Sequence, residues 1–262
     1  MPAVGDSGEM NPKALIIQNL RVQYQDGLES LRGINLEVEP NAITVFFGPA
    51  GGGKSTLLRT INRLVDLDNP KQLEGSILFH GKNILDPEVD VIELRRRIGV
   101  VFSRPIPLPL SIYQNVSFGL EVAGETDKKK LDQLVEQALH QSTLWDEVHD
   151  RLQDPASRLS GGQQQRLCLA RVLALKPEII MLDEPTSALD PVSTAKIEGF
   201  LQKAKKDYTI ILVPHNVSQA ARMADYAAFF LQGELIEYGV GKELFIKPKD
   251  KRTQDYIEGR FG

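Results

Sequence analysis

The chain has 262 residues, of which 42% are hydrophobic and 25% charged, so its composition is that of an ordinary globular protein with a sizeable core. Its net charge of −4 disfavours bulk attraction to nucleic acid, and we expect no nucleic-acid partner. The single cysteine, Cys168, excludes an intramolecular disulfide. No apolar run approaches the roughly 18 residues of a membrane helix, so any membrane contact requires a partner.

Along the chain, residues 1–12 are expected to be a disordered leader, followed by one domain over residues 13–262. Short apolar runs predict strands over residues 15–24, 31–38, 42–47, 74–80, 178–182 and 209–213. Helical spacing predicts helices over residues 54–65, 161–175, 192–205 and 218–224. The dipeptide Gln232-Gly233 predicts a hairpin between two last strands. Such alternation indicates an α/β fold with a mainly parallel sheet.

The stretch from about residue 90 to residue 159 differs from the rest. It contains a proline-rich loop over residues 104–109 and a polar helical segment over residues 127–145. That segment has one apolar stripe, formed by Leu131, Leu134, Val135, Ala138 and Leu139. We therefore predict a helical insertion, with a helical subdomain over about residues 103–165.

A glycine-rich loop follows the strand predicted over residues 42–47 and opens a helix. Its residues are Gly48, Pro49, Ala50, Gly51, Gly52, Gly53, Lys54, Ser55 and Thr56. In this context the sequence matches a phosphate-binding loop, whose backbone N–H groups converge on phosphate oxygens. Lys54 is expected to reach the β- and γ-phosphates of a nucleotide and Ser55 to bind Mg²⁺. The alternative is an incidental glycine-rich turn, which would leave the Lys-Ser-Thr sequence unexplained.

A second motif is the acidic pair that ends the apolar run over residues 179–182. Asp183 is expected to hold the metal, and Glu184 to polarise the attacking water. Alone, such a pair is more often a helix cap or a solvated turn. Its combination with the phosphate-binding loop favours the functional interpretation.

The third motif is formed by Ser160, Gly161, Gly162 and Gln163 within residues 159–166, and it resembles the signature sequence of ABC proteins. Ser160 is a suitable helix N-cap, and the two glycines leave backbone N–H groups accessible at a helix start, which makes a second anion site. A plain capped helix would leave the two glycines as an unexplained cost. The resemblance implies that this segment closes over ATP held by a second protomer, in a head-to-tail homodimer.

Further residues match ABC elements in the expected order. Tyr24 is similar to the aromatic residue that stacks on adenine, although a tyrosine at a strand end is as often a packing residue. Asp190 lies in a segment that resembles the loop spanning the dimer interface. His215 resembles the switch histidine that contacts the γ-phosphate.

Within this superfamily, the chain resembles the ATPase subunit of bacterial phosphate importers (the Pst system). The segments that carry this resemblance are residues 86–102, 104–115, 218–225 and 254–262. The resemblance implies an ABC ATPase fold, with a P-loop NTPase (RecA-like) core, an antiparallel β subdomain and an inserted α-helical subdomain. It also implies ATP and Mg²⁺ as cofactors, two transmembrane permease subunits, an indirect extracytoplasmic solute-binding protein, and a peripheral location on the cytoplasmic face of the cell (inner) membrane.

Three positions depart from the family pattern. Ala50 replaces a usual Ser, and Pro214 replaces the Thr that usually precedes the switch histidine. Ser103 replaces a Gln that, in the family, reaches Mg²⁺ and the attacking water and links ATP binding to the membrane subunits. Two other functions therefore stay open: a regulatory nucleotide switch with weak hydrolysis, and an ABC protein acting on ribosomes or DNA. The second is disfavoured by the single cassette and by the absence of heptads.

Overall fold

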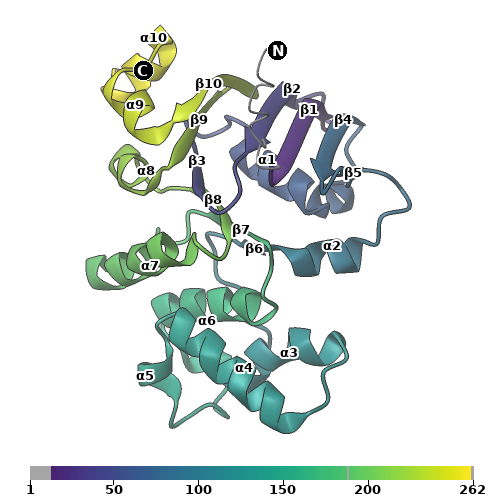
Figure 1. Cartoon of the computed structure of the whole chain (residues 1–262), viewed down its shortest axis with the longest axis vertical. Coiled ribbons are helices and arrows are strands. Elements are labelled where there is room, and N and C mark those ends of the chain that lie inside the picture. The colour runs from purple at the N-terminus through teal and green to yellow at the C-terminus, as the bar shows by residue number, and fades with distance from the viewer. Residues whose placement is uncertain (1–12, 188, 261–262) are drawn as a thin grey trace, which may run out of the picture.

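The computed structural model describes residues 13–187 and 189–260, and Figure 1 shows two sheets above a group of helices. The leader predicted over residues 1–12 lies outside the described residues. The smaller sheet is antiparallel with strand order β2-β1-β4-β5. Its strands are β1 (Leu15–Gln23), β2 (Glu29–Val38), β4 (Gln72–Phe79) and β5 (Lys82–Asn83).

The larger sheet has strand order β10-β9-β3-β8-β7-β6. Its strands are β3 (Ile43–Phe47), β6 (Ile98–Val101), β7 (Ile179–Asp183), β8 (Thr209–Val213), β9 (Tyr226–Leu231) and β10 (Glu234–Val240). All neighbours pair in parallel except β10, which pairs antiparallel with β9. The predicted hairpin is confirmed: Gln232 and Gly233 have φ values of 50° and 83°, the positive pair that a two-residue turn of this hand requires.

The helices cover the larger sheet and form a separate lobe. They are α1 (Lys54–Ile61), α2 (Val91–Arg97), α3 (Ile112–Val122), α4 (Lys128–Gln141), α5 (Trp145–Val148), α6 (Gly161–Ala174), α7 (Pro191–Ala204), α8 (Val217–Met223), α9 (Gly241–Ile246) and α10 (Lys251–Ile257). Short 3-10 helices lie at Leu64–Asp68 and Ala156–Arg158. Within the described ranges, no helix has the length and apolarity needed to cross a membrane.

Three sequence expectations need correction. The stretch from residue 90 is not purely helical, because β6 joins the parallel sheet beside β7. Its four residues are too few to signal a strand between an arginine-rich helix and a proline-rich loop. The first predicted helix stops at Ile61, since Arg63 adopts a left-handed φ of 62°. The helix predicted over residues 127–145 divides at Thr143, whose φ is 58°, into α4 and α5.

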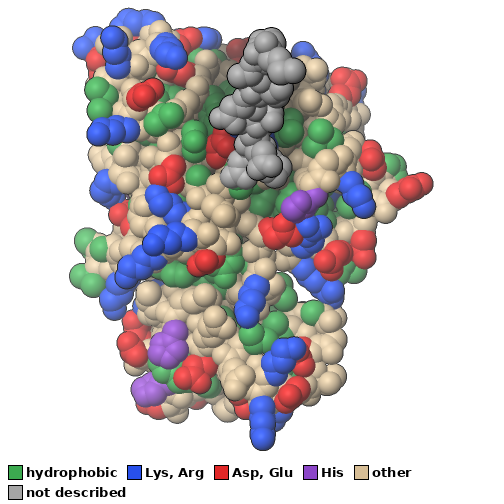
Figure 2. Space-filling model, in the orientation of Figure 1, with side chains coloured by type: hydrophobic (Ala, Val, Ile, Leu, Met, Phe, Trp, Pro, Cys, Tyr) green, Lys and Arg blue, Asp and Glu red, His purple; other side chains and the backbone are tan. Residues whose placement is uncertain are grey.

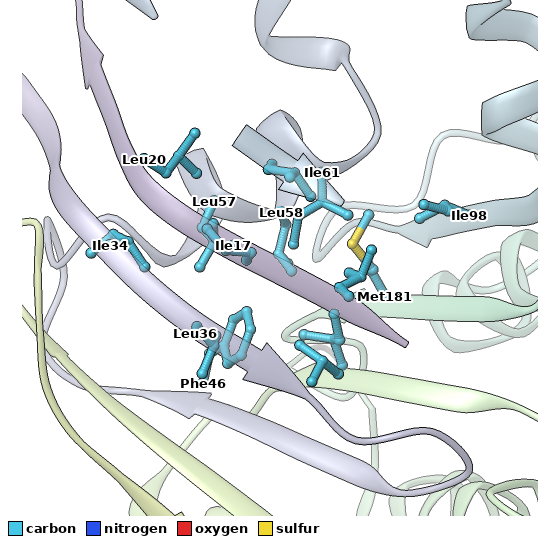
Figure 3. Close-up of a cluster of buried hydrophobic side chains, with 14 of the residues drawn as sticks. Ile17, Leu20, Ile34, Leu36, Phe46, Leu57, Leu58, Ile61, Ile98 and Met181 are labelled. Carbon is cyan, nitrogen blue, oxygen red and sulfur yellow. The ribbon is translucent and has the colours of Figure 1, made fainter. Parts of the chain in front are cut away.

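Side chains of the larger sheet alternate between two hydrophobic cores, as the pleat of a strand requires. Phe46 and Met181 face the antiparallel sheet and α1, whereas Phe47 and Leu182 face α6, α7 and α8. Figure 3 shows Leu57 and other α1 side chains lying between the strands of the two sheets. The α/β fold with a separate antiparallel sheet is therefore the predicted one, and the structure adds that the helix after the glycine-rich loop lies between the two sheets.

The lobe has its own core, formed by α3, α4, α5 and α6. Helix α6 serves two cores: Leu167 and Ala170 face the lobe, while Cys168 and Leu169 face the larger sheet. The lobe is thus attached to the sheet through a continuous helix. On the face drawn in Figure 2, basic and acidic side chains are interspersed, in keeping with the net charge of −4.

We expect Leu57→Ala to lower the free energy of unfolding by about 2–5 kcal/mol, because it opens a cavity between the sheets. Leu57 is 0% exposed, whereas Leu67, in the short 3-10 helix that follows α1, is 73% exposed. Leu67→Ala is the matched control and should change stability by no more than about 0.5 kcal/mol. Urea unfolding measures both variants. Equal losses would contradict the assignment of α1 to the core.

Candidate functional site

The glycine-rich loop joins β3 to α1, and its backbone requires glycine at two crowded positions. Gly48 has a φ of 139°, and a Cβ there would lie 2.0 Å from the carbonyl oxygen of Phe230. Gly53 has a φ of 93°, and a Cβ there would lie 2.5 Å from the carbonyl oxygen of Ser30. Side chains at these positions would push the loop away from its support.

That support comes from β2 and from the tip of the β9–β10 hairpin. The N–H of Gly233 donates to the carbonyl of Gly52 at 3.3 Å, and the N–H of Arg32 donates to the carbonyl of Gly233 at 2.8 Å. The hydroxyls of Ser30 and Thr56 are 2.8 Å apart. The loop is therefore fixed between the two sheets before any ligand binds.

The ammonium group of Lys54 is held inside the loop. Its Nζ donates to the carbonyl oxygens of Gly48 and Pro49, at 2.8 Å in each case. Burial lowers the pKa of Lys54, and the charges of Asp183 and Glu184 oppose that shift. The lysine and the acidic pair of the second motif thus belong to one electrostatic site.

The acidic pair lies where β7 ends. Asp183 is the last residue of β7, and Glu184 follows with a left-handed φ of 47°, a conformation that costs energy for a residue other than glycine. The N–H of Glu184 donates to the carbonyl of Val213 at 2.9 Å, which ties it to the end of β8. Its Oε2 lies 3.8 Å from Nδ1 of His215, and both side chains are accessible.

These segments surround a cavity of about 640 Å³. The sequence-predicted residues on its wall are Ala50, Gly51, Gly52, Gly53, Lys54, Ser55, Thr56, Asp183 and Glu184. Ser55 and Asp183 contribute a hydroxyl and a carboxylate, which are hard oxygen donors of the kind that Mg²⁺ takes when phosphates and water supply its other ligands. The donor set therefore fits the predicted metal.

Sequence reasoning missed part of this wall. Leu28, Arg32 and Gln232 also line the cavity, and Leu28 is 57% exposed. The turn-forming dipeptide Asp26-Gly27 in the sequence and the predicted hairpin at Gln232-Gly233 were available as signals. Neither turn, however, carries information about the loop that it approaches across the fold.

Other predicted residues lie outside the cavity wall. Tyr24 is half-buried and packs against the core between the sheets. Ser103 is exposed, two residues beyond the end of β6. The carboxylate of Asp190 caps α7 by accepting from the N–H groups of Val192 and Ser193, and the hydrogen bonds from Ser193 lower its pKa.

The signature segment forms the N-terminus of α6. Ser160 and Gln163 make a reciprocal capping box: the N–H of Gln163 donates to Oγ of Ser160 at 3.3 Å, and the N–H of Ser160 donates to Oε1 of Gln163 at 3.0 Å. Of the residues that the structure describes, none lies within 4 Å of a Cβ placed on Gly161, and a Cβ on Gly162 would meet the flexible end of Leu189 at 3.1 Å. Among the described residues that line the cavity, none comes from residues 160–163.

The site combines a buried parallel strand, a loop in which two glycines leave no room for a Cβ, a lysine at the start of the next helix and an acidic pair that ends another strand of the same sheet. This combination is typical of sites that hold nucleotide phosphates. The fold and site therefore define a phosphate-loop nucleotide-binding protein. The family model described as "ABC transporter" matches residues 31–187, more than half of the chain. The chain belongs to this family, and it is an ATPase subunit of an importer.

Specific relatives support this assignment. The chain is 49% identical over 256 residues to the "Phosphate import ATP-binding protein PstB" of Spiroplasma kunkelii, covering 98% of this chain and 95% of that protein. The resemblance to Pst-type ATPases is thus confirmed. CbiO1 of Clostridium perfringens, part of the ABC transporter complex cbiONQ, has a TM-score of 0.78 at 31% identity, covering 95% of this chain and 97% of that one.

A second solved structure is the dimer of the ATP-binding cassette MJ0796 in a post-hydrolysis state, bound to ADP and Pi. Its TM-score is 0.77 at 28% identity, and the match covers 87% of this chain and 99% of that one. Both structural neighbours share the ABC ATPase fold that the sequence predicted.

Gly48→Ala should weaken binding of a fluorescent ATP analogue at least tenfold, because the new methyl group would displace the loop from Phe230. Gly51→Ala is the matched control: Gly51 also has a positive φ, 74°, but a Cβ there meets nothing within 4 Å. It should lose less affinity than Gly48→Ala, since it incurs only the backbone strain of about 1–2 kcal/mol. Equilibrium titration compares them, and equal affinities would refute the steric argument.

Proposed function

We propose that this chain hydrolyses Mg-ATP as a homodimer on the cytoplasmic face of the cell (inner) membrane and powers import of inorganic phosphate. Its further partners would be two transmembrane permease subunits and, indirectly, an extracytoplasmic solute-binding protein. The observation that carries the proposal is the cavity that joins the phosphate-binding loop to Asp183 and Glu184. Full-length similarity to a phosphate-import ATP-binding protein supports the choice of solute.

Each part of the cavity has a distinct role in this proposal. The loop N–H groups from Gly51 to Ser55 and the ammonium of Lys54 bind the phosphates, and the N-terminus of α1 adds positive potential. Ser55 and Asp183 hold Mg²⁺, which when bound neutralises charge on the phosphates. Glu184 accepts the proton of the attacking water, and His215 beside it supplies a hydrogen bond to the γ-phosphate.

Two observations support a second protomer in the active site. Among the described residues, the signature segment does not line the cavity of its own chain, and none lies within 4 Å of the position that a Cβ on Gly161 would take. Glycine at a helix start is costly unless something must approach its backbone closely. In our proposal, that approach is made by ATP on the partner, and the dimeric state of MJ0796 offers a precedent.

The chemistry of the cavity does not identify the transported solute. None of the residues on the cavity wall would touch phosphate ion during transport, so the choice depends on the relative at 49% identity. The alternative of a regulatory switch depended on Ser103 alone, and the comparisons give it no support. The proposal includes stacking of Tyr24 on adenine, and it includes Ser103 near the nucleotide at the position where the family has the Gln that links ATP binding to the membrane subunits.

Glu184→Gln should keep ATP binding, lower turnover by about 10²–10⁴-fold and trap an ATP-bound dimer, because the amide cannot accept a proton from water. Turnover and size-exclusion chromatography with Mg-ATP measure both effects. Glu136→Gln, at an exposed site on α4, is the control. A Glu184→Gln protein that is monomeric and hydrolyses ATP at the parent rate would contradict the assignment.

The solute needs a separate measurement. Cells that depend on this chain should lose uptake of radiolabelled phosphate when it carries Glu184→Gln, and keep it with Glu136→Gln. If phosphate uptake persists while ATP turnover is lost, phosphate is not the transported solute, and the ATPase assignment is unaffected.

The signature should act across the dimer. Gly161→Asp should leave the stability of the monomer unchanged, because a Cβ there has free space among the described residues and a helix N-terminus favours an anion. In the proposed dimer, however, it would place a carboxylate against the partner's ATP. Lys54→Ala removes the phosphate-binding ammonium. We expect each variant to be inactive alone and their mixture to recover ATP hydrolysis, because one heterodimer site is intact. No recovery, with heterodimers demonstrated by differential tags, would refute the shared site.

A further inference from the structure

Gln219 is a buried amide that joins three elements behind the catalytic residues. It lies in α8 and is 3% exposed. It packs where α8, α7 and the segment after β7 meet, beside a cavity of about 540 Å³ whose wall also includes Thr186 and His215. A polar side chain at such depth is stable only if its hydrogen-bonding groups are used.

Both the oxygen and the nitrogen of the Gln219 amide form hydrogen bonds. Its Oε1 accepts from the backbone N–H of His215 at 2.9 Å. Its Nε2 donates to Oγ1 of Thr186 at 2.9 Å and to Oε1 of Glu198 at 3.0 Å. Arg222 holds Glu198 in place through two contacts, at 2.7 and 3.2 Å. Neither an apolar side chain nor a shorter amide can make this set of contacts from the same backbone position.

The contacts connect the two segments that carry the proposed chemistry. Thr186 is two residues beyond Glu184, and His215 follows β8. The bridge through Gln219 fixes the His215 loop relative to the end of β7. It acts in addition to the main-chain hydrogen bond from Glu184 to Val213, which joins the same strands. Gln219 itself is not among the described residues on the wall of the cavity beside the phosphate-binding loop, and it lies behind the Glu184–His215 pair, whose side chains are 3.8 Å apart.

We propose that Gln219 is a positioning residue that holds the His215 loop against the Thr186 segment and so aligns His215 with Glu184 for ATP hydrolysis. This inference rests on the roles proposed above for Glu184 and His215. It predicts that the amide of Gln219 affects the catalytic step and leaves nucleotide binding unchanged, because the phosphate-binding loop is held by β2 and by the hairpin.

The primary variant is Gln219→Met, which keeps chain length and removes both hydrogen-bonding groups. We expect kcat for ATP hydrolysis to fall at least tenfold, while KM for ATP stays within twofold of the parent value. Gln219→Glu keeps an oxygen that accepts from His215, but its other oxygen would face Oε1 of Glu198, to which Gln219 donates in the parent. Combined with Glu198→Gln, whose amide can donate to that oxygen, it should recover at least half of the activity that Gln219→Met loses.

The matched control is Gln202→Met. Gln202 also lies between α7 and α8, where its Nε2 donates to the carbonyl of Met223 at 3.4 Å, away from His215 and Thr186. Its kcat should stay within twofold of the parent value. A loss equal to that of Gln219→Met would show that any disturbance of helix packing lowers activity, and would overturn the inference.

A double-mutant cycle tests the route through His215. If Gln219 acts by placing His215, Gln219→Met should add less than a twofold loss to a His215→Ala protein. If the two substitutions instead lower kcat by factors that multiply, Gln219 does not act through His215. Thr186→Val removes the hydroxyl that accepts from Gln219 and keeps nearly the same side-chain volume, so it should also lower kcat. This variant serves as the test if Gln219→Met fails to fold.

The outcomes separate this inference from the proposed function. A Gln219→Met protein with parent kcat, alongside an inactive Glu184→Gln protein, refutes the positioning role alone. A fully active Glu184→Gln protein refutes the proposed catalytic roles first.

Discussion

The site depends on the parallel alignment of β3, β8 and β7, whose carboxyl ends meet at one edge of the larger sheet. The register pairs Val45 with Leu212 and Asp183 with Val213, so the phosphate-binding loop, the His215 loop and the acidic pair leave the sheet at the same level. In open α/β sheets, ligands bind outside this edge. The residues that follow these strands are far apart in sequence, and the register brings the phosphate-binding loop and the acidic pair around one cavity, with His215 beside Glu184.

The antiparallel sheet and the hairpin add rigidity to that edge. The loop glycines sit against the main chain of Ser30 and Phe230, where hydrogen bonds and steric exclusion act together. A loop fixed in this way loses little entropy when phosphate binds. The strained φ of Glu184 is tolerated for a related reason, because its N–H is bonded to β8 and the next turn is tied to α8 through Gln219.

Local patterns in the sequence predicted the phosphate-binding loop, the acidic pair, the Gln232-Gly233 hairpin and the α/β class, because each depends on residues adjacent in the chain. Strand β6 was missed because its four residues are stabilised by pairing with β7, which no local pattern records. Leu28 was missed because it reaches the cavity only through the packing of β2 on the loop. Gln219 was missed because its partners Thr186 and Glu198 are 33 and 21 residues away in sequence.

Helix α6 links the lobe to this edge of the sheet. Ser160 caps its N-terminus, and its later turns pack against both the lobe and the larger sheet. Nε2 of Gln165 donates to the carbonyl of Phe102 at 2.8 Å, so the chain entering the lobe at Ser103 is anchored to the same helix. The signature and this entry segment are therefore both held by one helix, although the side chain of Ser103 lies outside the cavity wall.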